Sequence, residues 1–101
     1  MVDTSQLSLD VRYVKDESVV ARIVGQEVLL VPTHNNVTEM DHIFVLNAVA
    51  ARIWQLLDGE HTLAEICAMI CDEFEVTSTE AEQDTVEFLS KLLSADIARR
   101  V

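Results

Sequence analysis

The stretch LNAVAARIWQLLDG, residues 46–59, contains the helix from which the rest of the chain can be interpreted. Asn47 is a suitable N-cap, because its side chain can accept a hydrogen bond from the free amides of the first helical turn. Four apolar residues then recur at the i, i+4, i+7 and i+8 spacing of one helical face. Gly59 suits the left-handed position after a helix, so we expect the helix to end at Asp58-Gly59. The four residues of the apolar face are Val49, Ile53, Leu56 and Leu57.

Two more helices are expected after this one. Residues 62–65, Thr-Leu-Ala-Glu, form a capping box in which the Thr62 hydroxyl and the Glu65 carboxylate satisfy each other's backbone amides. Residues 79–82, Thr-Glu-Ala-Glu, form a second capping box that predicts the start of the third helix. An apolar face follows each box at helical spacing. These faces are Leu63, Ile66, Cys67, Ile70 and Phe74 in the second helix, and Val86, Phe88, Leu89, Leu92 and Leu93 in the third.

The residues before the first helix have the composition of strands. Two apolar, β-branched runs, 19–24 and 27–31, flank the turn Gly25-Gln26 and predict an antiparallel hairpin. Pro32 stops the second strand because it cannot donate a hydrogen bond to the ladder. After the polar loop 33–41, residues 42–46 form a third apolar run.

The predicted order is therefore three strands followed by three helices. This order is typical of a two-layer α+β domain, with a three-stranded antiparallel sheet against three helices. We expect this domain to span residues 19–101 and the segment 1–18 to be weakly ordered, apart from a short leading strand at 11–14. With 101 residues and only two Gly and one Pro, the chain suits one domain with short connections.

The chain is strongly acidic, with a net charge of −11 at pH 7. Residues 60–76 contribute −5 and residues 77–94 contribute −3, so most of the excess lies on the second and third predicted helices. A helix that reads DNA presents Arg, Lys, Asn or Gln to the bases, whereas these helices present carboxylates. The charge argues against nucleic acid as the main partner and is compatible either with a solvated surface or with docking of a basic protein.

The sequence does not favour catalysis, a metal site or a cofactor. Cys67 and Cys71 share a helical face, but no second Cys/His cluster completes four ligands, and two small buried thiols are the simpler interpretation. The three His residues are scattered, and no phosphate-binding loop or nucleophile motif is present. No stretch approaches the 18 or so apolar residues of a membrane span, so we expect a cytoplasmic protein without a membrane partner.

Several segments together resemble the PqqD family. Residues 46–47 and 51–59 resemble its run Leu-Asn-x-x-Gly/Ala-Ala-x-Ile-Trp-x-Leu-Leu/Cys-Asp-Gly. Residues 61–66 are similar to its Thr-Val/Leu-x-Glu-Ile helix opening, and 73–76 to its acidic-aromatic helix end. Residues 84–92 resemble its third helix, Asp-Val-x-x-Phe-Leu-x-x-Leu. The resemblance covers roughly residues 19–97.

The resemblance implies a non-catalytic peptide chaperone with a fold related to winged helix-turn-helix domains. PqqD-like domains recognise the leader segment of a ribosomally made, post-translationally modified precursor peptide. They present the precursor to a modifying enzyme, often of the radical S-adenosylmethionine type, and the family is named for a role in cofactor biosynthesis. No cofactor of its own is implied for this chain.

The resemblance also implies where a leader peptide binds. The leader adds as a strand beside the third predicted strand, in the groove toward the third helix. Such addition takes affinity from main-chain hydrogen bonds and specificity from alternate side chains. For the residues on the third helix, the alternative is packing in the core. Carried over by position, the peptide-binding residues are Ile43, Phe44, Val45, Thr85, Phe88, Leu89 and Leu92.

Three features depart from the family pattern. The loop 33–41 is longer than the usual link between the second and third strands. Ala95-Asp96-Ile97 stands where the family often has Gly-Leu, and the acidic excess is unusual. The alternative function is a winged-helix-like module for protein interaction, homodimerisation or regulation of transcription. DNA binding would require the available arginines to gather on one face, and these are Arg12, Arg22, Arg52, Arg99 and Arg100.

Overall fold

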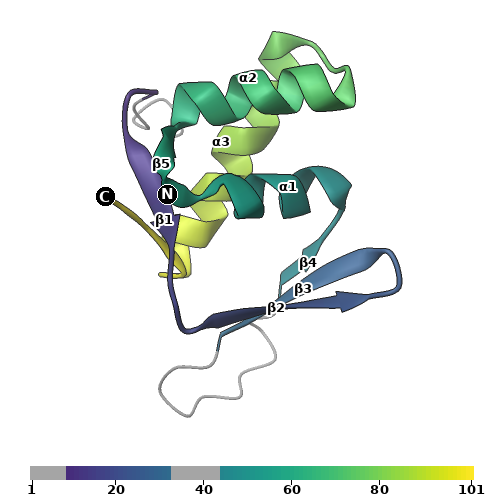
Figure 1. Ribbon diagram of the computed structural model, residues 1–101, viewed down its shortest axis with the longest axis vertical. Helices are drawn as coiled ribbons and strands as arrows, with labels where there is room; N and C mark the ends of the chain where they lie inside the picture. The colour runs from purple at the N-terminus through teal and green to yellow at the C-terminus, as the bar shows by residue number, and fades with distance from the viewer. Residues whose placement is uncertain (1–8, 33–43) are drawn as a thin grey trace.

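The computed structural model describes residues 9–32 and 44–101, and these ranges form three helices and two three-stranded antiparallel sheets (Figure 1). The prediction of a mixed fold with an antiparallel sheet and three helices is confirmed. The elements are β1 (Arg12–Lys15), β2 (Val19–Val24), β3 (Glu27–Pro32), β4 (Phe44–Leu46), α1 (Ala48–Leu56), β5 (Asp58–Thr62), α2 (Leu63–Phe74), α3 (Ser78–Ser94) and β6 (Ala98–Arg100).

The starts of α1 and α2 are where the sequence predicts them. Asn47 caps α1, and its Oδ1 accepts a hydrogen bond from the Ala50 amide at 2.9 Å. Thr62 caps α2 with both hydrogen bonds of a capping box: the Glu65 amide donates to Thr62 Oγ1 at 3.2 Å, and the Thr62 amide donates to Glu65 Oε1 at 2.7 Å. These side chains satisfy backbone donors that a helix leaves free at its first turn.

The start of α3 differs from its prediction. The capping box expected at residues 79–82 is wrong, because the N-cap is Thr77, whose Oγ1 accepts a hydrogen bond from the Glu80 amide at 3.1 Å. Thr77 keeps an extended backbone while Ser78 already begins the helix. Either threonine could cap a helix by residue type, so local sequence alone did not choose between them.

The first sheet has the order β2-β3-β4. Strands β2 and β3 form the predicted hairpin, in which Val24 lies opposite Glu27 and Gly25 adopts a positive φ of 63° in the turn. Strand β4 pairs antiparallel with β3, with Val45 opposite Leu29. The third strand is confirmed over 44–46, whereas His42, Ile43 and the loop 33–41 lie outside the described residues.

The second sheet was not predicted. It has the order β5-β1-β6, so the short strand at 12–15 is central and pairs with strands from the middle and the end of the chain. These four residues lie where we expected a short leading strand, at 11–14, within a segment that we otherwise expected to be weakly ordered. Their order depends on partners about fifty and eighty-five residues away in sequence, which local patterns do not report.

The end of α3 shows how Ala95-Asp96-Ile97 replaces the Gly-Leu that the family often has at this point. Asp96 adopts a positive φ of 62°, the left-handed conformation that glycine favours at this position. The Asp96 amide donates to the Leu93 carbonyl at 3.1 Å, and the Ile97 amide donates to the Leu92 carbonyl at 3.1 Å. This is the hydrogen-bond pattern of a Schellman motif, and it directs the fully buried Ile97 into the core before β6 begins.

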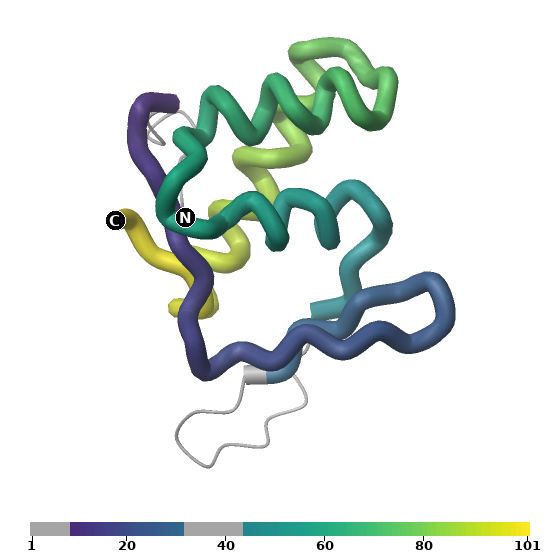
Figure 2. The backbone as a smooth tube through the Cα atoms, viewed as in Figure 1, coloured from purple at the N-terminus to yellow at the C-terminus, as the bar shows by residue number. Residues whose placement is uncertain are grey.

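The core lies between the helices and the two sheets. Figure 2 shows α1 and α2 running side by side with α3 crossing behind them, and the β2–β3 hairpin on the far side of α1. Leu57, Leu63, Ile66 and Leu89 are fully buried, which confirms the predicted apolar faces as core positions. On the surface, Arg52 of α1 holds Glu73 of α2 through two hydrogen bonds of 2.9 and 3.2 Å.

Asp58 organises the link between α1 and α2. Its Oδ1 accepts hydrogen bonds from the Glu60 amide at 2.9 Å and the His61 amide at 3.2 Å, and the His61 ring nitrogen Nδ1 lies 3.0 Å away. The hydrogen bond from the Glu60 amide, with a smaller contribution from His61, lowers the pKa of the Asp58 carboxyl from 3.8 to about 2. The charged carboxylate therefore stabilises the native link.

The variant Asp58→Asn should show this contribution as a pH dependence. A carboxyl whose folded pKa is lowered stabilises the protein above its ordinary pKa, and the stabilisation is lost as the pH falls through the folded value. We expect the variant to be less stable at pH 7, because it lacks this charge. The loss should be only about 1 kcal/mol, because the Asp58 side chain is partly exposed and its charge is screened by solvent. Urea unfolding between pH 7 and pH 2 checks this, and the gap should close between about pH 4 and pH 2. A gap that is constant over that range contradicts the role of the charge.

Candidate functional site

The outer edge of β4 is one part of the candidate site. Within the described residues β4 pairs only with β3, so its other edge offers backbone groups to a further strand. The side chains alternate, with Val45 59% exposed, Phe44 half-buried and Leu46 buried. Leu46 anchors the strand in the core, while the side chain of Val45 faces outward.

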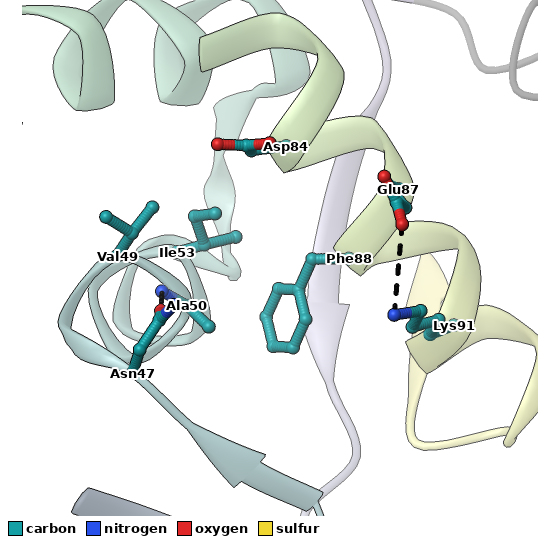
Figure 3. A pocket seen from close by; sticks show the side chains of 8 residues that line it. All are labelled: Asn47, Val49, Ala50, Ile53, Asp84, Glu87, Phe88 and Lys91. Atoms are coloured by element: carbon teal, nitrogen blue, oxygen red, sulfur yellow. Dashed lines mark hydrogen bonds and ion pairs between the residues drawn. The ribbon is translucent and has the colours of Figure 1, made fainter. Parts of the chain in front are cut away.

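A pocket of about 270 Å³ between α1 and α3 is the other part of the site. Figure 3 shows the ring of Phe88 on α3 pointing toward α1, across from Ala50. Asn47, the residue directly after β4, lines the same pocket, so β4 ends beside it. We call this concavity the α1–α3 pocket, and its lining residues are Asn47, Val49, Ala50, Ile53, Asp84, Glu87, Phe88 and Lys91.

The sequence fixes the shape of this pocket through helix ends and spacing. The hydrogen bond from the Ala50 amide to Asn47 Oδ1 sets the direction in which α1 leaves β4. On α3, Asp84, Glu87, Phe88 and Lys91 recur at the spacing of one helical face. Glu87 and Lys91 form an ion pair of 3.9 Å at the pocket rim, as their i, i+4 spacing predicts. The pocket thus combines an apolar floor with a rim that carries negative and positive side chains.

The structure divides the predicted peptide-binding residues into two groups. Phe44, Val45 and Phe88 have exposed surface at the β4 edge or in the α1–α3 pocket, and Ile43 lies outside the described residues. The other three, Thr85, Leu89 and Leu92, are 0% exposed and pack in the core. These three side chains are therefore not accessible to a peptide in this structure.

Thr85 in particular faces away from the α1–α3 pocket. It lies against Cys67 of α2, where burial raises the pKa of the thiol and the Thr85 hydroxyl acts in the opposite direction to a smaller extent. Thr85 and Phe88 are three residues apart, so their side chains leave α3 in directions about 60° apart, one toward the core and the other toward the pocket. The sequence match to a family motif does not reveal which side chains of α3 point into the core and which point into the pocket.

Sequence reasoning missed most of the pocket lining. Asn47, Val49 and Ile53 were assigned only to the cap and the core face of the first helix, and Ala50 was not singled out. A signal was present on α3, where Asp84, Glu87 and Lys91 continue the face of Phe88 at helical spacing. The charge on this helix was interpreted only as a solvated surface or as a docking face for a basic protein.

The chain is similar to one known protein family over most of its length. A family model described as coenzyme PQQ synthesis protein D (PqqD) matches residues 27–98, which is most of the chain. The chain belongs to the PqqD family. This match includes β3, β4 and all three helices, and therefore both parts of the candidate site.

Two solved structures are similar to this PqqD-family chain over nearly their whole length. One is described as TbiB1 in complex with the TbiA(beta) leader peptide: it is 29% identical, with a TM-score of 0.67, over 85% of this chain and 94% of that one. The other is a lasso peptide synthetase B1 complexed with the leader peptide: it is 25% identical, with a TM-score of 0.68, over 87% and 98%. The comparison with curated proteins gave no match.

The described part of this PqqD-family chain contains no candidate metal-ligating group and no candidate membrane-spanning helix. No group of three or more His, Cys, Asp and Glu residues is placed to hold a metal ion within residues 9–32 and 44–101. In the same ranges, no helix has the length and apolar character needed to cross a bilayer. What the site presents is a free strand edge, an apolar pocket and a polar rim, which are the components of peptide recognition by strand addition.

Proposed function

We propose that this protein binds the leader segment of a ribosomally made precursor peptide and presents the precursor to a modifying enzyme, without catalysing a reaction itself. The observation that carries the proposal is that β4, whose outer edge pairs with no strand in the described ranges, ends beside the α1–α3 pocket. The two similar structures support it, since both are described as complexes with leader peptides. The radical S-adenosylmethionine type is one candidate class for the modifying enzyme, because enzymes served by the PqqD family are often of this type.

In this mode the leader adds as a strand along β4. Its backbone exchanges hydrogen bonds with residues 44–46, and Val45 contacts its outward-facing side chains. Beyond Leu46 the peptide passes Asn47 and places an apolar side chain against Phe88 in the α1–α3 pocket. Thr85, Leu89 and Leu92 contribute from the core by holding α3 in position, and Ile43 is proposed to extend the pairing surface by one residue.

The alternative, a winged-helix-like module that regulates transcription, is less well supported. A winged helix-turn-helix-like arrangement fits the order of the hairpin and the three helices, and it remains part of the proposal for the fold. The acidic side chains on α2 and α3 oppose DNA binding, because contact with phosphates requires cations. Peptide recognition by strand addition does not require cations, because it uses main-chain hydrogen bonds.

Isothermal titration calorimetry tests the proposal. The titrant is the leader segment of the precursor encoded beside this gene, and a scrambled peptide of the same composition is the control. We expect saturable binding of one leader per chain with a Kd of about 10 μM or tighter, and no heat from the scrambled peptide. Absence of heat with a leader that the modifying enzyme requires would overturn the proposal.

A further inference from the structure

A second concavity lies on the opposite side of α3 from the leader site. It has a volume of about 670 Å³ and runs along α2, between the N-terminal end of the described chain and the first turns of α3. We call it the α2 groove. Its floor is apolar and its rim is acidic. The floor residues are Leu9, Ala64, Cys67, Ala68 and Cys71, and the rim residues are Asp72, Glu75, Ser78 and Glu82.

Among the residues that the structure describes, no Lys or Arg lines the groove beside the rim carboxylates. Asp72, Glu75 and Glu82 line the groove without any Lys or Arg, and residues 60–76 contain none at all. Glu82 lies near enough to Cys67 to raise the pKa of that thiol, which places its charge over the apolar floor. Three like charges close together repel one another, and a cationic occupant relieves that repulsion.

The α2 groove shares no lining residue with the α1–α3 pocket. The groove uses α2 and α3 up to Glu82, whereas the leader site uses β4, α1 and α3 from Asp84 onward. A leader on β4 and an occupant of the groove can therefore bind at the same time. This separation is what a protein needs if it must hold a peptide and a second protein together.

We propose that the α2 groove docks a segment of the modifying enzyme in which an apolar side chain is flanked by Lys or Arg. The apolar side chain lies on Ala64, Ala68 and the two cysteines, and the cations face the rim carboxylates. This inference rests on the proposed function, since it names the surface through which that function engages the enzyme.

Charge distinguishes this occupant from two others. A second copy of this chain carries −11 and is repelled by the rim. The chain's own residues 1–8 contain Asp3 and no Lys or Arg, so they do not complement the rim. A cationic segment with an apolar anchor satisfies both the floor and the rim.

Two variants test the docking surface in the full chain. Asp72→Lys with Glu82→Lys reverses two rim charges at exposed positions that make no ion pair in the described structure. Ala68→Trp fills the groove from an exposed position on α2 without changing charge. The control is Glu17→Lys with Glu27→Lys, which makes the same change in net charge at exposed positions outside both concavities.

Binding of each variant is measured separately to the purified modifying enzyme encoded beside this gene and to the leader peptide. We expect both groove variants to bind the enzyme at least about tenfold more weakly, with leader affinity unchanged within about twofold. The control should bind both partners like the wild type. Raising the salt concentration should weaken enzyme binding of the wild type more than that of the charge-reversed variant.

The outcomes separate this inference from the proposed function. If the wild type binds the leader but the groove variants bind the enzyme as well as it does, or if the enzyme does not bind at all, the docking surface is wrong and leader binding stands. If the control loses affinity as much as the charge-reversed variant, net charge rather than the groove governs docking, and the inference is also overturned. Failure of the wild type to bind the leader instead contradicts the proposed function.

Discussion

Ile53→Ala should lower the free energy of unfolding by about 2–5 kcal/mol, which is a large part of the roughly 5–15 kcal/mol that holds a domain of this size together. Ile53 lies in the middle of α1 and is 1% exposed, so truncation removes buried methyl groups and leaves a cavity between α1 and its neighbours. Leu89→Ala on α3, at a fully buried position, should cost a similar amount. Chemical denaturation in urea measures both.

Ile23→Ala is the matched control, because the chemical change is the same and the side chain is 80% exposed on β2. Its cost should stay below about 1 kcal/mol, the range of strand preferences at a surface position. If Ile53→Ala and Ile23→Ala shift the urea midpoint equally, the assignment of Ile53 to the core is wrong.

Ala50→Trp should weaken leader binding by about tenfold to a hundredfold, which corresponds to loss of one buried apolar side chain of the peptide from the α1–α3 pocket. Ala50 is half-buried on α1 and lies opposite Phe88, so an indole at this position occupies the space that the peptide side chain requires (Figure 3). Calorimetry with the leader peptide measures the change, and thermal unfolding confirms that the variant is folded.

Ala48→Trp provides the control for this experiment. Ala48 is the first residue of α1, is exposed and does not line the α1–α3 pocket. Its substitution adds the same ring beside the site without filling the pocket, and leader affinity should stay within about threefold of the wild type. Equal losses in the two variants would show that the pocket does not hold part of the leader.

The helical half of the fold was predictable because its signals are local. The Asn47 cap and the Thr62 capping box each act within one turn, and each is present as expected, whereas α1 ends at Leu56 with Leu57 as its C-cap, before the expected Asp58-Gly59. The sheet β5-β1-β6 was not predictable, because its strands are short and come from three distant parts of the sequence. Its strand β5 contains the Asp58-Gly59 pair that we had interpreted only as a helix end.

The site was predictable to a similar, limited extent. The motif match identified the right elements, β4 and α3, and Phe88 is placed at the surface it requires. It could not separate Phe88 from Leu89 and Leu92, because one helix presents apolar residues both to the core and to a pocket. That distinction depends on where α1 lies relative to α3, which is a property of the tertiary packing.

Hydrogen exchange of the β4 amides, measured by NMR with and without saturating leader peptide, tests most directly whether the leader adds as a strand. If it does, main-chain hydrogen bonds form along the free edge, and exchange at one or more amides of residues 44–46 should slow by at least about tenfold. Amides on the exposed face of α2 should keep their rates. Tight binding of the leader with unchanged exchange throughout β4 would contradict strand addition.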